Sequence, residues 1–265
     1  MKLHITHATR YRYDRPVDYA LQKVRLRPLS SVLQNVGPWD VTIEGGKTEA
    51  SYQDHYGNHT DLVSATPGTE NLSITAKGIA ETNDMAGVLG HVYGRAPLWH
   101  FQQQTILTEP GAGVKDLAAA IAKAKDTLDG LHDLSMEIIS AAPYEIGKTN
   151  ATTTAEQALV LGAGVCQDHA NIFVSAARVA GLPARYISGY LMMDDRVDQD
   201  ASHAWAEVHL PDLGWVGFDV SNGISPDARY VRIAAGRDAR DAAPISGLRM
   251  GSSYEQMVVS VQVQQ

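Results

Sequence analysis

The sequence holds a single cysteine among its 265 residues, and the residues around it are those expected of a nucleophile. Cys166 lies in the segment GAGVCQD (residues 162–168), where glycines interrupt the chain just before the thiol. Apolar residues then recur at helical spacing as far as Ala180, which predicts a helix that begins at or near Cys166. The unpaired N–H groups and the dipole of such a helix start favour a thiolate over a thiol.

A histidine and an aspartate further along the chain could complete an acyl-transfer site. In the segment SHAWAEVHL (residues 202–210), small and apolar residues alternate with His203, Trp205, Glu207 and His209, as in a strand. Trp205 would give His203 a wall that excludes water, and Asp219 ends the next predicted strand. Thiolate, imidazole and orienting carboxylate are the three parts of a cysteine acyl-transfer site.

The register of these two strands decides whether Asp219 can reach His203. The two side chains share a face of the sheet only if the residue opposite Asp219 is odd-numbered. A strict four-residue loop would place Asp219 opposite Ala206, on the wrong face. We therefore expect a bulge in this hairpin or a loop of odd length.

The same residues have plainer interpretations. A free cysteine often packs as a small buried hydrophobe, and the His203 strand could simply turn one face to solvent. Cys166 and His169 form a C-x-x-H pair to which Asp168, His203 or His209 could add metal ligands, but the sequence has no second such pair and supports zinc weakly. Otherwise His169 is a packing residue behind the site, and Asp168 either favours the helix start or holds a neighbouring loop.

The elements that must position these residues fall into two predicted parts. Alternating apolar residues in segments 3–13, 39–43 and 72–76, separated by turn residues, predict an antiparallel β-sandwich over residues 1–83. A stretch rich in glycine and proline, about residues 84–113, is expected to link it to the second part.

The second part, residues 84–265, is predicted to be α+β, with helices followed by an antiparallel sheet. Helices are expected over about 117–128 (ending at Gly130), 131–142, 155–161 (with Thr154 as N-cap) and 166–180, and strands over 185–192, 202–210, 214–220 and 257–263. Residues 221–250 show no clear period. This arrangement packs the Cys166 helix on the strands that carry His203 and Asp219.

Composition narrows the functional class. A formal net charge of −8 argues against general binding to nucleic acid or to anionic membranes, which require clustered Lys and Arg. The sequence contains no apolar run of membrane-spanning length, and its first residues alternate rather than form a secretory signal. One cysteine cannot form an internal disulfide, so we expect a reduced, cytoplasmic protein.

Three motifs in order, GxGVCQD, SHAWAEV and GWVGFDxSN, resemble the core of bacterial transglutaminase-like proteins, which belong to the papain-like superfamily. The resemblance covers about residues 115–222, and residues 1–83 resemble the N-terminal domain that commonly precedes this core. One departure is that residues 220–222 read VSN where the family often has PTN. The resemblance implies a papain/transglutaminase-like fold with the nucleophile at a helix N-terminus.

The resemblance also implies roles and partners. Cys166 matches the nucleophile, His203 the base and Asp219 the orienting acid. The residues that could line the site are Asp168, Trp205, Gln167 and His169. The expected activity is transamidation, deamidation or proteolysis through a thioester, with a protein or peptide glutamine or amide as donor, an amine or water as acceptor, and no metal or organic cofactor. The alternative is a non-catalytic binding or scaffolding module of the same fold.

The loop of residues 193–201 precedes the His203 strand. Its sequence does not decide whether an amine or water accepts the acyl group. Its aspartates at positions 194, 195, 198 and 200 stand against one arginine. The loop is either an acidic lid that favours a cationic amine or a solvated surface turn.

Overall fold

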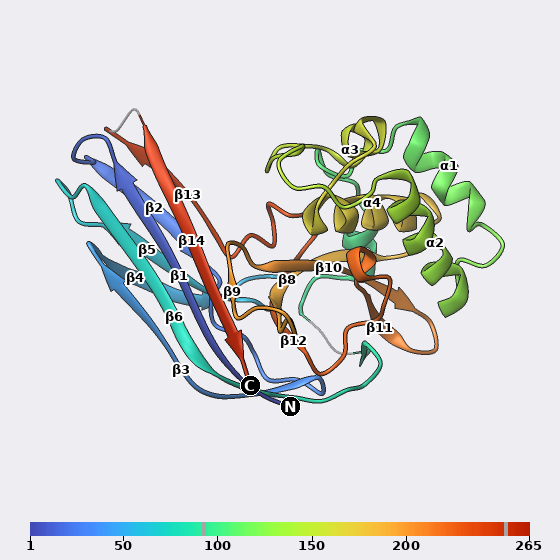
Figure 1. The fold of residues 1–265 in the computed structure, drawn as a ribbon, viewed down its shortest axis with the longest axis horizontal. Helices are drawn as coiled ribbons and strands as arrows, with labels where there is room; N and C mark the ends of the chain where they lie inside the picture. The colour runs from blue at the N-terminus through green and yellow to red at the C-terminus, as the bar shows by residue number, and fades with distance from the viewer. Residues whose placement is uncertain (92–93, 252–253) are drawn as a thin grey trace.

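The computed structural model describes residues 1–91, 94–251 and 254–265. Two sheets packed against each other form one end of the molecule, and helices form the other, with a third sheet between them (Figure 1). The fold is therefore mixed α and β with antiparallel sheets. Two residues of the predicted linker, 92 and 93, lie outside the described residues.

We call the two packed sheets the double sheet. Its first sheet has the order β3-β6-β1-β14-β9 and its second the order β13-β2-β5-β4. The strands are β1 (Lys2–Tyr13), β2 (Tyr19–Val24), β3 (Gln34–Glu44), β4 (Gly46–Gln53), β5 (His59–Ala65), β6 (Asn71–Thr82), β9 (Asp198–Gln199), β13 (Ile245–Met250) and β14 (Glu255–Gln264). Alternate residues of both sheets, such as Tyr11, Val24, Val63 and Ile74, meet in one buried core.

The end of the chain belongs to the double sheet. β14 pairs antiparallel with β1, from His4 opposite Gln264 to Tyr13 opposite Glu255, and β13 pairs with β2. The two termini consequently lie side by side (Figure 1). The sequence predicts residues 245–265 as part of the helical region, because alternating apolar residues identify a strand but not the strand that it pairs with.

The third sheet, which we call the central sheet, has the order β12-β8-β10-β11-β7. Its strands are β7 (Val88–Gly90), β8 (Ala184–Leu191), β10 (His203–Leu210), β11 (Gly214–Phe218) and β12 (Tyr230–Gly236). One face packs on the helices through residues such as Ala184 and Val208, and the other holds a buried cluster that includes Ile187, Trp205 and Tyr230. Tyr190 of β8 and Ile233 of β12 also pack on β1, β6 and β14. Since both faces are covered, the interpretation of β10 as a strand with one solvent face is wrong.

The helices are α1 (Ala112–Ala120), α2 (Leu128–Ala141), α3 (Ala155–Leu161) and α4 (Cys166–Val179), with short 3-10 turns η1 (Leu98–Gln102) and η2 (Val220–Asn222). The predicted cap of α3 is confirmed, since the Thr154 side chain accepts from the N–H of Gln157. The predicted stop at Gly130 is wrong: Gly130 lies in the first turn of α2, whose N-cap is Thr127. A side chain at Gly130 would collide with the backbone of Ala124, which explains the glycine.

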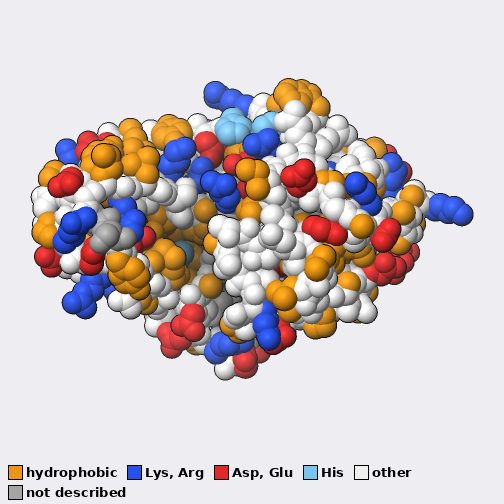
Figure 2. All heavy atoms as spheres, turned by 90° about the horizontal axis from the view of Figure 1, so that it is seen from above, with side chains coloured by type: hydrophobic (Ala, Val, Ile, Leu, Met, Phe, Trp, Pro, Cys, Tyr) orange, Lys and Arg blue, Asp and Glu red, His pale blue; other side chains and the backbone are white. Residues whose placement is uncertain are grey.

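None of the helices in the described ranges is long and apolar enough to cross a membrane. Seen from above, acidic and basic side chains are interspersed over the surface (Figure 2). This face therefore carries no broad field of one sign, in keeping with the mixed composition.

Candidate active site

Cys166 is the first residue of α4 and is partly exposed. Asp168, two residues on, is buried, and its Oδ2 accepts from the backbone N–H of Val165 (2.9 Å) and from the hydroxyl of Thr149 (2.6 Å). The carboxylate therefore fixes the helix start and also holds the preceding loop, the two roles proposed from the sequence.

Tyr144 lies beside the thiol although nothing in the sequence pointed to it. Its segment runs next to Gly164, where the N–H of Glu145 donates to the Gly164 carbonyl (2.9 Å). Burial and then the charge of Cys166 raise the pKa of Tyr144, so its hydroxyl stays protonated at neutral pH. About half of Tyr144 is exposed, next to the segment that leads into α4.

His203 and Asp219 meet because the β10–β11 hairpin has the odd-length loop that the sequence required. Leu210 pairs with Gly214, which leaves three residues in the loop and, by extension of the register, places Asp219 opposite Trp205. His203 Nε2 lies 2.6 Å from Asp219 Oδ2, and both side chains are buried. The register expectation is confirmed.

Asp219 is held by two further donors. Asn222 Nδ2 donates to Asp219 Oδ2 (2.6 Å), as does the hydroxyl of Tyr230 (2.7 Å). Burial alone would raise the pKa of Asp219, but these donors and His203 outweigh it and lower the pKa. The sequence predicts no role for Asn222 or Tyr230. Asn222 ends the motif GWVGFDxSN, whereas Tyr230 lies in residues 221–250, which show no periodic pattern of apolar residues.

His203 links the carboxylate to the thiol. Its Nε2 faces Asp219, which leaves Nδ1 as the ring nitrogen available to the thiol of Cys166. Burial opposes the positive charge, but hydrogen bonds and charges of Asp219 and Cys166 outweigh it and raise the pKa of His203 to about 10. The ring of Trp205 lies 6.4 Å from the His203 ring and is buried, so it screens the imidazole from water.

The two other residues predicted to line the site, His169 and Gln167, lie in different surroundings. His169 points away from the thiol: Nε2 lies 2.7 Å from the Ala142 carbonyl and Nδ1 lies 2.8 Å from the Ser221 hydroxyl. Gln167 is partly exposed and lines a neighbouring cleft. Among the residues that the structure describes, no group of three or more His, Cys, Asp or Glu side chains could hold a metal ion.

The loop of residues 193–201 is anchored to the double sheet. Its β9 segment pairs with β14, and Asp198 accepts from Gln262 Nε2 (2.8 Å). A cleft of about 530 Å³ lies next to this loop, and its charged lining residues are Asp194, Asp195, Arg196 and Arg229. Two acids stand against two bases there, so the cleft is not an acidic pocket as a whole.

Comparisons with known proteins point the same way as the motifs. The model of the transglutaminase-like superfamily matches residues 115–220, and that of the bacterial transglutaminase-like N-terminal region matches residues 3–81. Proteins of Mycobacterium bovis and Mycobacterium tuberculosis, named only as uncharacterized, are 30% identical over 290 residues, which cover 98% of this chain and 90% of theirs. An uncharacterized protein of Mycobacterium leprae is 26% identical over 276 residues, covering 99% of this chain and 98% of its own.

A crystal structure from Cytophaga hutchinsonii, named as that of a candidate cysteine protease, is similar to the whole chain. Its TM-score is 0.76 at 20% identity, with 100% of this chain and 98% of that chain covered. At this identity the likeness shows a shared fold.

Proposed function

Because this chain belongs to the transglutaminase-like superfamily and carries the bacterial transglutaminase-like N-terminal region, we propose that it catalyses cysteine-dependent acyl transfer on carboxamide or peptide bonds. The observation that carries the proposal is the buried pair of His203 and Asp219, which lie 2.6 Å apart; against the effect of burial, Asp219 and Cys166 raise the pKa of His203 to about 10. On this proposal Cys166 is the nucleophile, His203 the base and Asp219 the orienting acid.

The first step is proton transfer from the Cys166 thiol to His203, which gives a thiolate–imidazolium pair. Asp219 supports it in two ways: its negative charge favours the imidazolium, and its short hydrogen bond fixes the ring. Asn222 and Tyr230 hold the carboxylate in turn, so the ring has few alternative orientations.

The thiolate then attacks the carbonyl carbon of the amide, and a C–S bond forms as the carbonyl oxygen takes up the negative charge. On this proposal the backbone N–H of Cys166, at the start of α4, donates to this oxygen, a contact worth about 3 kcal/mol. The imidazolium of His203 donates its proton to the departing nitrogen as the C–N bond breaks. A thioester remains and ammonia or an amine leaves.

Deacylation restores the thiol. An amine or a water molecule loses a proton to His203 and attacks the thioester carbonyl, and the C–S bond then breaks. We propose a protein or peptide with a glutamine or another amide as donor. Because opposite charges balance in the cleft beside residues 193–201, nothing in that cleft favours a cationic amine over water.

A direct test compares ammonia release from a glutamine-containing peptide with and without an added primary amine, while mass spectrometry follows peptide-bond cleavage. We expect Cys166→Ala and His203→Ala to lower the rate of ammonia release or of peptide cleavage, whichever the wild type shows, by at least about a thousandfold. His209→Ala, on the same strand as His203, is the matched control and should keep the activity. Equal activity in Cys166→Ala and wild type would refute the proposal, and a folded wild type without activity on any peptide would favour the non-catalytic module.

A further inference from the structure

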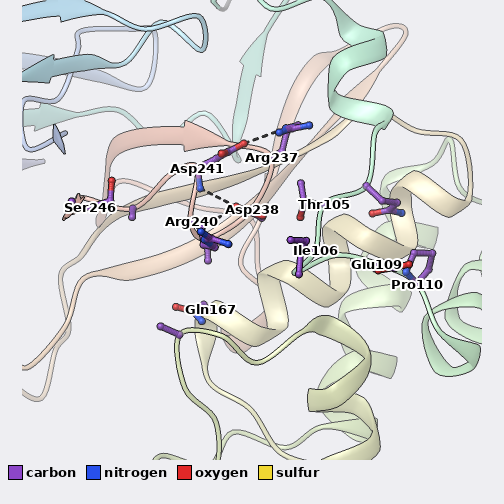
Figure 3. Close-up of a pocket in the computed structure, with 15 residues that line it drawn as sticks. Thr105, Ile106, Glu109, Pro110, Gln167, Arg237, Asp238, Arg240, Asp241 and Ser246 are labelled. Atoms are coloured by element: carbon purple, nitrogen blue, oxygen red, sulfur yellow. Dashed lines mark hydrogen bonds and ion pairs between the residues drawn. The ribbon is translucent and has the colours of Figure 1, made fainter. Parts of the chain in front are cut away.

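A large cleft opens next to Gln167, the residue that follows the candidate nucleophile. It has a volume of about 1040 Å³, above the range of about 300–1,000 Å³ of small-ligand pockets. Gln167 lines it together with Ala239, which packs against the same buried cluster as Cys166. Figure 3 shows Gln167, Ser246 and Ile106 around the same hollow, contributed by α4, by β13 and by the segment before α1.

Both walls of this cleft are tied to the protein core. On one wall, the loop of residues 237–243 is held by a hydrogen bond from Arg178 Nη2 to the Arg237 carbonyl (2.7 Å) and by one from the Tyr56 hydroxyl to Asp241 (2.6 Å). On the other wall, Gln104 Nε2 donates to the Ser175 carbonyl of α4 (3.0 Å). The cleft is therefore pre-formed, and a ligand does not have to order it.

The cleft continues along β13. Ser246 and Gly247 line both the large cleft and a second hollow of about 270 Å³, which extends past Leu248 to Arg249. Residues that line the two hollows thus extend from Gln167 along this strand to Arg249. The five residues from Ile245 to Arg249 span roughly 13 Å at about 3.3 Å per residue, which suits an extended chain rather than a compact ligand.

β13 is also an edge strand. It is the last strand in its sheet order, and within the described chain its backbone pairs with β2 alone. The N–H of Arg25 on the β2 side donates to the Pro244 carbonyl (2.7 Å). In an antiparallel pair every second residue turns its N–H and C=O toward the partner, so after Pro244 these residues are Ser246 and Leu248. The backbone N–H and C=O groups of Ile245, Gly247 and Arg249 therefore point outward from the sheet.

We propose that the free edge of β13 binds a polypeptide segment of the acyl donor as an added antiparallel or parallel strand, and that the cleft leads this segment to Cys166. The inference rests on the proposed function. The partner is an extended peptide next to the reacting amide, recognised mainly through its main-chain N–H and C=O groups. The double sheet, through β13, then forms one wall of the substrate site.

The test uses peptides that carry a chloroacetamide in place of the reacting side-chain amide, since these alkylate Cys166 without any turnover. We expect peptides extended by five residues on one side of the electrophile to react at least tenfold faster than a capped single residue. Backbone N-methylation at alternate positions of the extension should remove the gain, and N-methylation at the intervening positions should leave it.

A pair of variants locates the site. Arg249→Pro removes one outward N–H without touching a bond to β2, and Arg249→Ala is the matched control, since both lose the ion pair with Glu255 (3.5 Å). The gain for a long peptide should fall in Arg249→Pro and persist in Arg249→Ala. Equal rates for long and short peptides, or N-methylation without alternation, would overturn the proposal. The rate with iodoacetamide, which needs no cleft, separates this failure from a failure of the nucleophile itself.

Discussion

At the scale of single residues, His203 is the proton carrier of the proposed mechanism, and its charge depends on its neighbours. Burial disfavours the imidazolium, whereas Asp219 and Cys166 stabilise it and raise the pKa of His203 to about 10. A proton donor for the leaving nitrogen is therefore available throughout the neutral range. The sequence could predict the three residue types and their order, but Tyr230 could not be predicted as a partner of Asp219, because it lies 11 residues further on in a segment without a period.

The first prediction concerns the pH dependence of acyl transfer. Since the pKa of His203 is raised, the protonated form is lost only as the pH rises through about 10, and the rate should fall there. In Asp219→Asn the charge that raises this pKa is gone, so the fall should move to lower pH by about 1–3 units. A pH–rate profile of both proteins measures this. A fall at the same pH in both would mean that Asp219 does not set the pKa of His203.

At the scale of elements, local signals predicted well wherever the chain carries them. Thr154 and Gln157 form the cap of α3 from adjacent side chains, so the sequence alone located that helix. β12 was missed because all of its residues are buried and no alternation remains. The surroundings of β10 could not be predicted for a different reason: its second face is buried through contacts far along the chain, such as Trp205 with Tyr230 and Glu207 with Arg232.

The second prediction concerns an ion cluster that joins three strands of the central sheet. Glu207 on β10 is buried and pairs with Arg185 on β8 (2.5 Å) and Arg232 on β12 (3.0 Å). Glu207→Gln leaves two buried cations without their carboxylate, so we expect a loss of about 3–5 kcal/mol in the free energy of unfolding, measured with urea. Glu145→Gln, which breaks an exposed pair with Lys148, is the control and should cost less than about 1 kcal/mol.

The pH dependence of that stability follows from the same cluster. Burial raises the pKa of Glu207, but the two arginines outweigh it and lower the pKa below the ordinary value of 4.5. The contribution of Glu207 is therefore complete above about pH 4.5 and lost as the pH falls through the lowered pKa. Equal acid sensitivity of wild type and Glu207→Gln would contradict this assignment.

At the scale of the whole molecule, the double sheet and the central sheet share a core. Leu3 of β1, Ala80 of β6 and Val261 of β14 pack against Tyr190 and Val231 of the central sheet. The first and last segments of the chain therefore support the strands that carry the candidate site. This dependence could not be predicted from the sequence, because it rests on contacts between the two ends of the chain.

The third prediction tests this dependence on one strand. Val261→Asp places a charge without a partner in the shared core, so both parts should lose stability together, by several kcal/mol. Val258→Asp is the control, because Val258 lies on the same strand but is about half exposed. Urea unfolding followed by circular dichroism and by tryptophan fluorescence should give coincident transitions, shifted only in Val261→Asp. Two separate transitions in the wild type would mean that the parts fold independently.

The most direct test of the central claim is the rate of iodoacetamide alkylation of Cys166 against pH, in the wild type and in His203→Ala. With one cysteine in the chain, mass spectrometry assigns every modified thiol to this residue. We expect rapid alkylation well below pH 8.5, about the pKa of a free cysteine, and its loss in His203→Ala, because the imidazolium stabilises the thiolate. A rate that rises only near pH 8.5 and is the same in both proteins would contradict the thiolate–imidazolium pair on which the proposed function depends.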